Sequence, residues 1–156
     1  MRKTKAKRIP PARDPIYNDR LVTRFVNEIM QEGKKSKAFG IFYGALDSIK
    51  ASTSHEGYEI WKKALDTVSP GVEVRSRRIG GATFQIPVPV RDARKLSLSM
   101  KWIIKYAKQR KGISMSEKLA SELIAASKGE GQAVKKKEDT HKMAEANKAF
   151  SHFKFK

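Results

Sequence analysis

Residues 72–90 depart from the helical pattern of the rest of the chain and restrict its fold more than any other segment. The β-type runs VEVRSRRI and ATFQIPVPV lie on either side of Gly80 and Gly81. Two adjacent glycines between such runs are typical of a β-hairpin with a two-residue turn. The sequence therefore predicts two antiparallel strands joined at the glycine pair.

Two prolines in the second run limit the size of this sheet. A turn at the glycine pair places Arg77 opposite Phe84 and Val74 opposite Pro87. In that register Pro87 and Pro89 occupy non-hydrogen-bonded pairs, and their nitrogen atoms face outward. Because proline has no N–H group to donate, the outer side of the second strand cannot join another strand. We therefore expect a two-stranded ribbon that projects from the helices.

One face of the predicted ribbon mixes cationic and apolar side chains. Arg75, Arg77, Ile79, Phe84 and Ile86 share this face. Near the tip, neither face of the ribbon resembles an ordinary buried surface. The alternative is a hairpin packed onto the core, with its arginines reaching solvent along apolar neighbours.

The other segments have the periodicity of amphipathic helices. In the first, apolar pairs recur every four residues from Leu21 to Met30, after a predicted N-cap at Asn18 or Asp19. The spacing of Thr53 and Glu56, and of Ser114 and Glu117, predicts capping boxes that begin the third and fifth helices. The fold class is therefore mainly α, with the ribbon between the third and fourth helices. With their caps and stop signals, the six segments are expected at 19–33, 37–51, 53–69, 91–110, 114–129 and 133–150.

The charge of the chain predicts a polyanionic partner. It has 34 Lys and Arg residues against 16 Asp and Glu residues, a formal net charge of +18 at pH 7 over 156 residues. A compact domain with this charge repels itself, so nucleic acid is the first candidate for a stable partner.

Several classes of protein are disfavoured by what the sequence lacks. It has no cysteine, and His55, His141 and His152 are scattered, which argues against disulfides, thiol chemistry and a metal site. No apolar run approaches the roughly 20 residues of a membrane span, and the basic N-terminus lacks the apolar run of a signal peptide. We expect a soluble cytosolic protein without a metal ion or cofactor.

Both ends of the chain look extended. Residues 1–13 contain no acid and include Pro10 and Pro11, so they predict a basic arm of the kind that often binds nucleic acid; the alternative is a solvated tail. Residues 150–156 alternate aromatic residues and lysines. They either stack on the bases of a single-stranded nucleic acid or form a flexible tail. The cationic residues of the arm are Arg2, Lys3, Lys5, Lys7, Arg8 and Arg13.

The fourth helix carries a cationic stripe beside its apolar one. After Asp92 no acid interrupts it, whereas a solvated helix usually places Glu four residues from Lys. This favours a nucleic-acid contact along the helix over a merely solvated face. The stripe comprises Arg91, Arg94, Lys95, Lys101, Lys105 and Lys108.

The sequence contains little that supports an enzymatic function. The GKKS sequence that ends at Ser36 is similar to the end of a phosphate-binding P-loop, but Glu28 stands where that motif needs glycine and no strand precedes it. His55 and His141 each lie near acids, yet such positions are more often structural than catalytic. An RNA-modifying or RNA-cleaving enzyme is therefore the least favoured hypothesis.

Four ordered blocks resemble a known family. DPIYNDRLVTRFVNEIMQEGKKSKA, SPGVEVRSRRIGGATFQIPVPV, KWIIKYAKQR and GEGQAVKKKEDTHKMAEANKAF are similar to the bacterial type of small-ribosomal-subunit protein seven, over nearly the whole chain. The resemblance implies a six-helix bundle with a β-hairpin arm, forming a single rRNA-binding domain over residues 1–156. It also implies a primary binder of the 3′ major domain of the small-subunit rRNA, which nucleates assembly of the subunit head.

The resemblance further implies a place in the ribosome and a set of contacts. The chain would lie near the exit-site tRNA and the mRNA path, beside small-subunit proteins nine and eleven, in the cytoplasm and not as a homo-oligomer. The tRNA-proximal part of the hairpin would be Arg78, Gly80, Gly81 and Phe84. The implied rRNA contacts include Lys3, Lys5, Lys7 and Arg8 of the arm, Arg75, Arg77 and Arg78 of the hairpin, and Arg91, Arg94 and Lys95 of the fourth helix.

One alternative remains from another class. An architectural DNA-binding protein would use the proline-bearing ribbon as a minor-groove arm. That hypothesis explains the ribbon but not the basic residues spread over the arm and the fourth helix.

Overall fold

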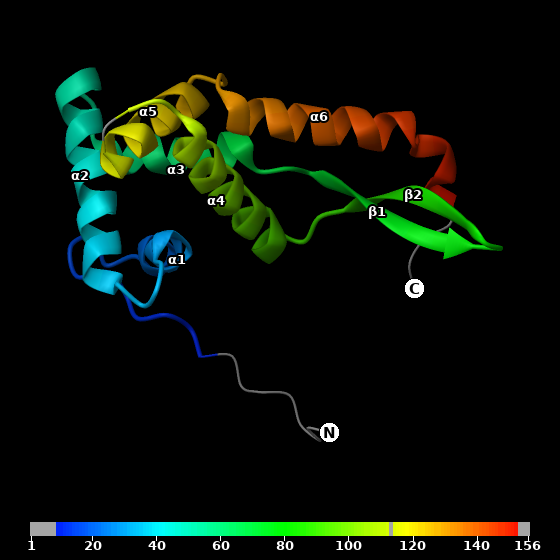
Figure 1. Ribbon diagram of the computed structural model, residues 1–156, viewed down its shortest axis with the longest axis horizontal. Coiled ribbons are helices and arrows are strands. Elements are labelled where there is room, and N and C mark those ends of the chain that lie inside the picture. The colour runs from blue at the N-terminus through cyan, green and yellow to red at the C-terminus, as the bar shows by residue number, and fades with distance from the viewer. Residues whose placement is uncertain (1–8, 113, 153–156) are drawn as a thin grey trace. The chain divides into compact units, whose positions relative to one another are not determined.

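The computed structural model describes residues 9–112 and 114–152 (Figure 1). The mainly helical fold, with a two-stranded hairpin between the third and fourth helices, is confirmed. The first compact unit ends at Gly40, within α2, and the second begins at Ile41. The elements are α1 (Arg20–Ile29), α2 (Lys35–Thr53), α3 (Gly57–Val68), β1 (Val72–Ile79), β2 (Ala82–Pro89), α4 (Asp92–Gln109), α5 (Met115–Ser127), α6 (Gln132–Ala146) and the 3-10 helix η1 (Lys148–His152).

Two aspartates shape the start of α1 in the first unit. The carboxylate of the buried Asp14 accepts a hydrogen bond from the backbone N–H of Tyr17 at 2.8 Å. Asp19 accepts one from the backbone N–H of Leu21 at 2.9 Å, which satisfies a free donor of the first turn. The predicted N-cap is confirmed, and the helix buries Val22, Thr23, Phe25, Val26 and Ile29.

The ends of the first two helices differ from the sequence prediction. α1 stops at Ile29 instead of reaching Gly33, and α2 spans Lys35–Thr53 instead of 37–51. Glu32 and Gly33 have φ values of 53° and 72°. This left-handed backbone cannot continue a right-handed helix, so the chain turns before Gly33.

The predicted capping box at the start of α3 is wrong. Thr53 still belongs to α2, and its hydroxyl donates to the carbonyl of Ile49 at 2.8 Å. Ser54 then takes a φ of 56° and ends that helix. α3 begins at Gly57, behind Glu56, whose side chain makes no capping hydrogen bond.

Glycine is required at the start of α3 because a Cβ on Gly57 would lie 2.5 Å from the backbone oxygen of Leu46. We expect Gly57→Ala to lower the free energy of unfolding, measured in urea, by about 1–3 kcal/mol, since the backbones must move apart. Gly44→Ala is the matched control. There the new Cβ would lie 3.5 Å from the Cβ of Ser116, and alanine should raise the stability by about 0.5–1 kcal/mol. Equal stabilities would show that the close approach has no cost.

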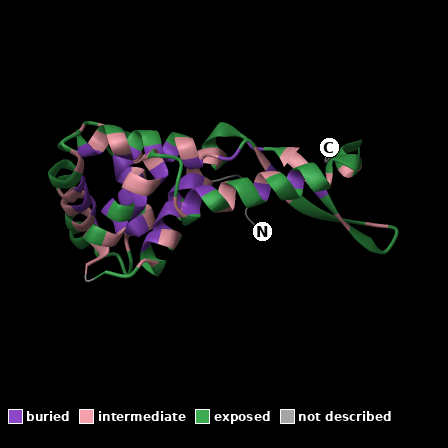
Figure 2. Cartoon of the chain, turned by 90° about the horizontal axis from the view of Figure 1, so that it is seen from above, coloured by how far each residue is buried: buried purple, intermediate pink, exposed green. Residues whose placement is uncertain are grey.

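The core of the second unit lies between helices (Figure 2). α5 contacts both α3 and α4, and α6 contacts all three. Trp61 of α3 meets Phe42 of α2 edge to face, with ring centroids 5.4 Å apart. Side chains that are fully buried here include Ile49, Met100, Ile103, Leu119 and Leu123.

The ribbon has the predicted register. Arg77 pairs with Phe84 and Val74 with Pro87 in one antiparallel, two-stranded sheet. Gly80 and Gly81 both have positive φ, 57° and 91°, as a two-residue turn of this type requires.

The ribbon is packed at its root and exposed at its tip. Both views show α6 running beside the strands (Figures 1 and 2), and η1 contacts β2. Ile86 is buried, and the rings of Phe84 and Phe150 lie 5.3 Å apart. The tip glycines have open space on their Cβ side. The hypothesis of a hairpin packed onto the core thus describes the root of the ribbon, and the hypothesis of a projecting ribbon describes its tip.

The sixth helix is shorter than expected. The sequence predicts one helix over 133–150, whereas α6 ends at Ala146 and η1 follows. Asn147 lies between them, and its side-chain amide donates to the carbonyl of Met143 at 2.8 Å. An asparagine that bonds to the backbone in this way competes with continued helix. Phe150, assigned from sequence to the flexible tail, lies in η1; residues 153–156 lie outside the described residues.

Candidate nucleic-acid interface

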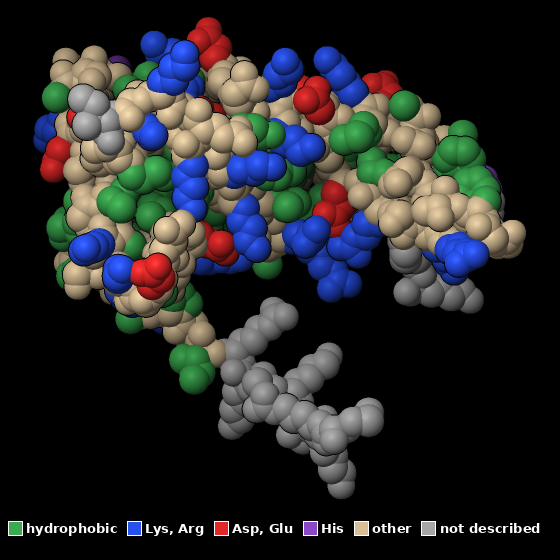
Figure 3. All heavy atoms as spheres, in the orientation of Figure 1, with side chains coloured by type: hydrophobic (Ala, Val, Ile, Leu, Met, Phe, Trp, Pro, Cys, Tyr) green, Lys and Arg blue, Asp and Glu red, His purple; other side chains and the backbone are tan. Residues whose placement is uncertain are grey.

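α4 presents its cationic stripe to solvent because its apolar stripe is held in the core. Met100, Ile103, Ile104 and Ala107 are buried. Figure 3 shows Lys and Arg side chains gathered over α4 and the root of the ribbon. The exposed cations of this segment are Arg91, Arg94, Lys101, Lys105 and Lys108, and Lys95 is half-buried.

The ribbon continues this basic surface. Arg75, Arg77 and Arg78 are all exposed on β1. The root of the ribbon adjoins the start of α4, because only Val90 and Arg91 separate Pro89 from that helix. The structure thus brings the predicted residues of the hairpin and of α4 onto neighbouring elements.

Of the predicted arm, residues 9–13 are described; they form no helix or strand, and Arg13 is exposed. Arg2, Lys3, Lys5, Lys7 and Arg8 lie outside the described residues. Their contacts with RNA stay a prediction.

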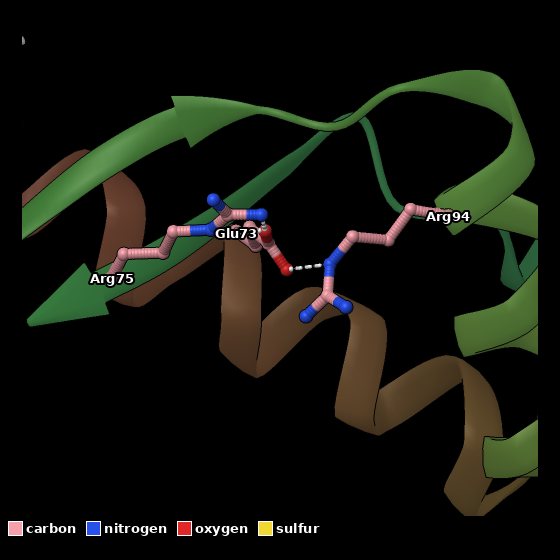
Figure 4. Close-up of polar contacts among 3 residues, drawn as sticks. All are labelled: Glu73, Arg75 and Arg94. Carbon is pink, nitrogen blue, oxygen red and sulfur yellow. Dashed lines mark hydrogen bonds and ion pairs between the residues drawn. The ribbon is translucent and has the colours of Figure 1, made fainter. Parts of the chain in front are cut away.

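The sequence patterns do not predict the role of an acid at the root of the ribbon. Glu73 of β1 is buried, and its carboxylate lies between two of the predicted RNA-binding arginines (Figure 4). One oxygen accepts from Arg75 Nε at 2.6 Å, and the other from Arg94 Nε at 2.7 Å. The cationic stripe of α4 therefore does have an acidic partner, supplied by a strand and not by the helix itself.

Part of this arrangement has a signal in the sequence. Residues two apart on a strand point to the same side, so Glu73 and Arg75 could have been expected to meet. Arg94 is 21 residues from Glu73 in sequence, and no local pattern links them.

The arginines lower the pKa of Glu73. Burial alone would raise the pKa of its carboxyl, but hydrogen bonds and charge from Arg94 and Arg75 outweigh burial and hold it below the ordinary value of 4.5. A carboxylate with a lowered pKa stabilises the fold above its unfolded pKa, and this contribution is lost as pH falls through the folded pKa.

Acid should therefore weaken the tie between the ribbon and α4. We expect the wild type to lose more free energy of unfolding than Glu73→Gln between about pH 6 and about pH 3, because only the wild type has this carboxylate to protonate. Urea unfolding of both proteins at the two pH values measures the difference. Parallel losses would contradict a stabilising role for the ionised carboxylate.

A second buried acid fixes the far end of α4. Glu122 of α5 is fully buried and ion-paired with Arg110, the C-cap of α4. Its other oxygen accepts from the backbone N–H of Ala133 at 3.1 Å, in the first turn of α6. One carboxylate thus joins three helices.

The structure shows the positions of the two histidines that lie near acids in the sequence. His141 Nε2 accepts a hydrogen bond from the backbone N–H of Gly71 at 3.1 Å, tying α6 to the segment before β1. His55 is exposed between α2 and α3. Over residues 9–112 and 114–152, no group of three or more His, Asp or Glu side chains could hold a metal ion.

In the described part of the chain, no helix has the length and apolar character needed to cross a membrane.

Comparisons with known proteins find relatives that match almost the whole chain. A family model described as Ribosomal protein S7p/S5e matches residues 1–148. A relative from Cytophaga hutchinsonii, called Small ribosomal subunit protein uS7, is 58% identical over 155 residues, which are 99% of this chain and 100% of that protein. Proteins of the same name from Flavobacterium johnsoniae and Porphyromonas gingivalis are 60% and 55% identical, again over 99% of this chain and all of each relative. Because both the family match and these relatives extend over almost all of its length, the chain belongs to the ribosomal protein S7p/S5e family.

Proposed function

We propose that this chain binds the 3′ major domain of the small-subunit rRNA and nucleates assembly of the subunit head. Its family is one of non-enzymatic structural proteins of the small ribosomal subunit. The observation that carries the proposal is the basic surface shared by the ribbon and α4. Its cations are exposed, except for the half-buried Lys95, while the opposite side of the helix is buried. Phosphates are the natural ligands of such a surface, and folded RNA is recognised largely through shape and backbone contacts.

The finer placement belongs to the same proposal. The ribbon tip, with Arg78, Gly80, Gly81 and Phe84, would lie near the exit-site tRNA and the mRNA path. Small-subunit proteins nine and eleven would be its neighbours in the cytoplasmic ribosome. We further propose that residues 1–156 act as one rRNA-binding domain and that the chain binds as a single copy, without a cofactor.

A competition experiment tests the proposal against the DNA alternative. Labelled transcript of the 3′ major domain is bound to the full chain and challenged with unlabelled transcript or with duplex DNA, at one fixed salt concentration. We expect the transcript to compete at far lower concentration, because the basic surface covers a helix and a ribbon and is not confined to a minor-groove arm. Preferential displacement by duplex DNA would overturn the proposal.

A further inference from the structure

An acid in the middle of a phosphate-binding surface needs an explanation. Glu73 lies where β1 and α4 come together, and its charge should repel an RNA phosphate that approaches Arg75 or Arg94. If the surface worked by charge alone, this acid would only weaken it.

We propose that Glu73 is a positioning residue, which holds the guanidinium groups of Arg75 and Arg94 as a paired site for one phosphate of the RNA backbone. The proposal rests on the proposed function and names one site within it. The two arginines come from different elements, so this phosphate would be held between the ribbon and α4.

The geometry leaves the arginines able to bind. Arg75 uses Nε and Nη2, each 2.6 Å from one oxygen of Glu73, and Arg94 uses Nε, 2.7 Å from the other oxygen. A guanidinium has five N–H donors, so these contacts leave donors on both arginines. The Arg75 and Arg94 side chains are 49% and 52% exposed, against 9% for Glu73. In Figure 4 the dashed line that joins Arg94 to the carboxylate starts at Nε.

Holding the arginines in place favours binding in two ways. A guanidinium presents a planar fork that matches phosphate geometry, so its orientation matters. A side chain that is already ordered also loses less conformational freedom when the ligand arrives. The three side chains together keep a net positive charge, because two arginines face one carboxylate.

Removal of the Glu73 charge should change RNA affinity in opposite directions under the two explanations. Affinity should fall if Glu73 positions the arginines, and rise if the surface works by charge alone. Glu73→Gln and Asp92→Asn each remove one negative charge from the same basic surface. Asp92 is the matched control because its side chain is 96% exposed and its partner is Lys95, at 3.0 Å. Affinity of the full chain is measured for the 3′ major domain transcript and for an unrelated RNA of equal length.

We expect Glu73→Gln to bind the 3′ major domain transcript about tenfold more weakly, the size of effect typical of a charge-assisted hydrogen bond. Asp92→Asn should bind it equally well or more tightly. Unrelated RNA, held by charge, should not lose affinity for either variant. Tighter or unchanged binding of the transcript by a natively folded Glu73→Gln would overturn the proposal.

A second pair of variants tests the proposal even if Glu73→Gln does not fold. Arg94→Lys and Arg91→Lys both keep the charge and replace the fork with an ammonium group. Of these two arginines, only Arg94 is bound by Glu73. We expect Arg94→Lys to bind the transcript about fivefold more weakly and Arg91→Lys to bind nearly as the wild type does. Equal losses would overturn the positioning role, whereas a wild type that does not prefer the transcript would refute the proposed function itself.

Discussion

Glu122→Ala should lower the free energy of unfolding by about 3 kcal/mol, the low end of the range for breaking a buried ion pair. The low end applies because Glu122 is fully buried while the Arg110 side chain is 32% exposed and can recover some solvation. The substitution also leaves the N–H of Ala133 without its acceptor. Three helices would lose their common contact at once.

The matched control is an exposed acid of the same helix. Glu117→Ala removes a charge from the first turn of α5 and should cost only about 0.3–1 kcal/mol through the helix dipole. Urea unfolding of both variants measures the contrast. A loss below about 1 kcal/mol for Glu122→Ala would show that the buried carboxylate does not hold these helices together.

The largest effect on binding is expected from the stripe of α4. Replacing Lys101, Lys105 and Lys108 together by Gln should weaken rRNA binding roughly a hundredfold near 0.1 M salt. Each phosphate contact that is lost lowers the logarithm of the binding constant by about 0.7–0.9 for each tenfold step in salt concentration below about 1 M. All three are exposed, so the fold should be retained. The slope of log affinity against log salt should become shallower by about 2–3.

A second triple variant separates a local surface from bulk charge. Lys62, Lys63 and Lys128 are also exposed, but they lie on α3 and after α5. Their replacement by Gln makes the same change in net charge, and we expect a much smaller loss of affinity with little change in the salt slope. Equal losses from the two triple variants would mean that total charge, and not the surface on α4, governs binding.

Local signals in the sequence are sufficient to predict the turn and the register of the ribbon. The glycine pair fixed its turn, and the prolines showed that no third strand follows, so the register was predicted residue by residue. The caps at Asp19 and Ser114 were found for the same reason, since each bonds to a backbone N–H two or three residues ahead.

Contacts between distant residues could not be predicted. Thr53 matched a capping box, but α3 begins instead where Gly57 meets the backbone of Leu46. The ion pair of Glu73 with Arg94 likewise depends on how the strand and helix pack. The charge pattern therefore indicated where phosphate could bind, whereas the packing shows which cations an acid holds in place.

The central claim is that many cations on several elements bind the rRNA together. The most direct test is the affinity of the full chain for the 3′ major domain transcript over a range of salt concentrations. If about 8–10 phosphates are neutralised, the slope of log affinity against log salt should lie between about −6 and −9. A slope near −2 would contradict the account, because it would leave no more than about three phosphate contacts for the whole basic surface.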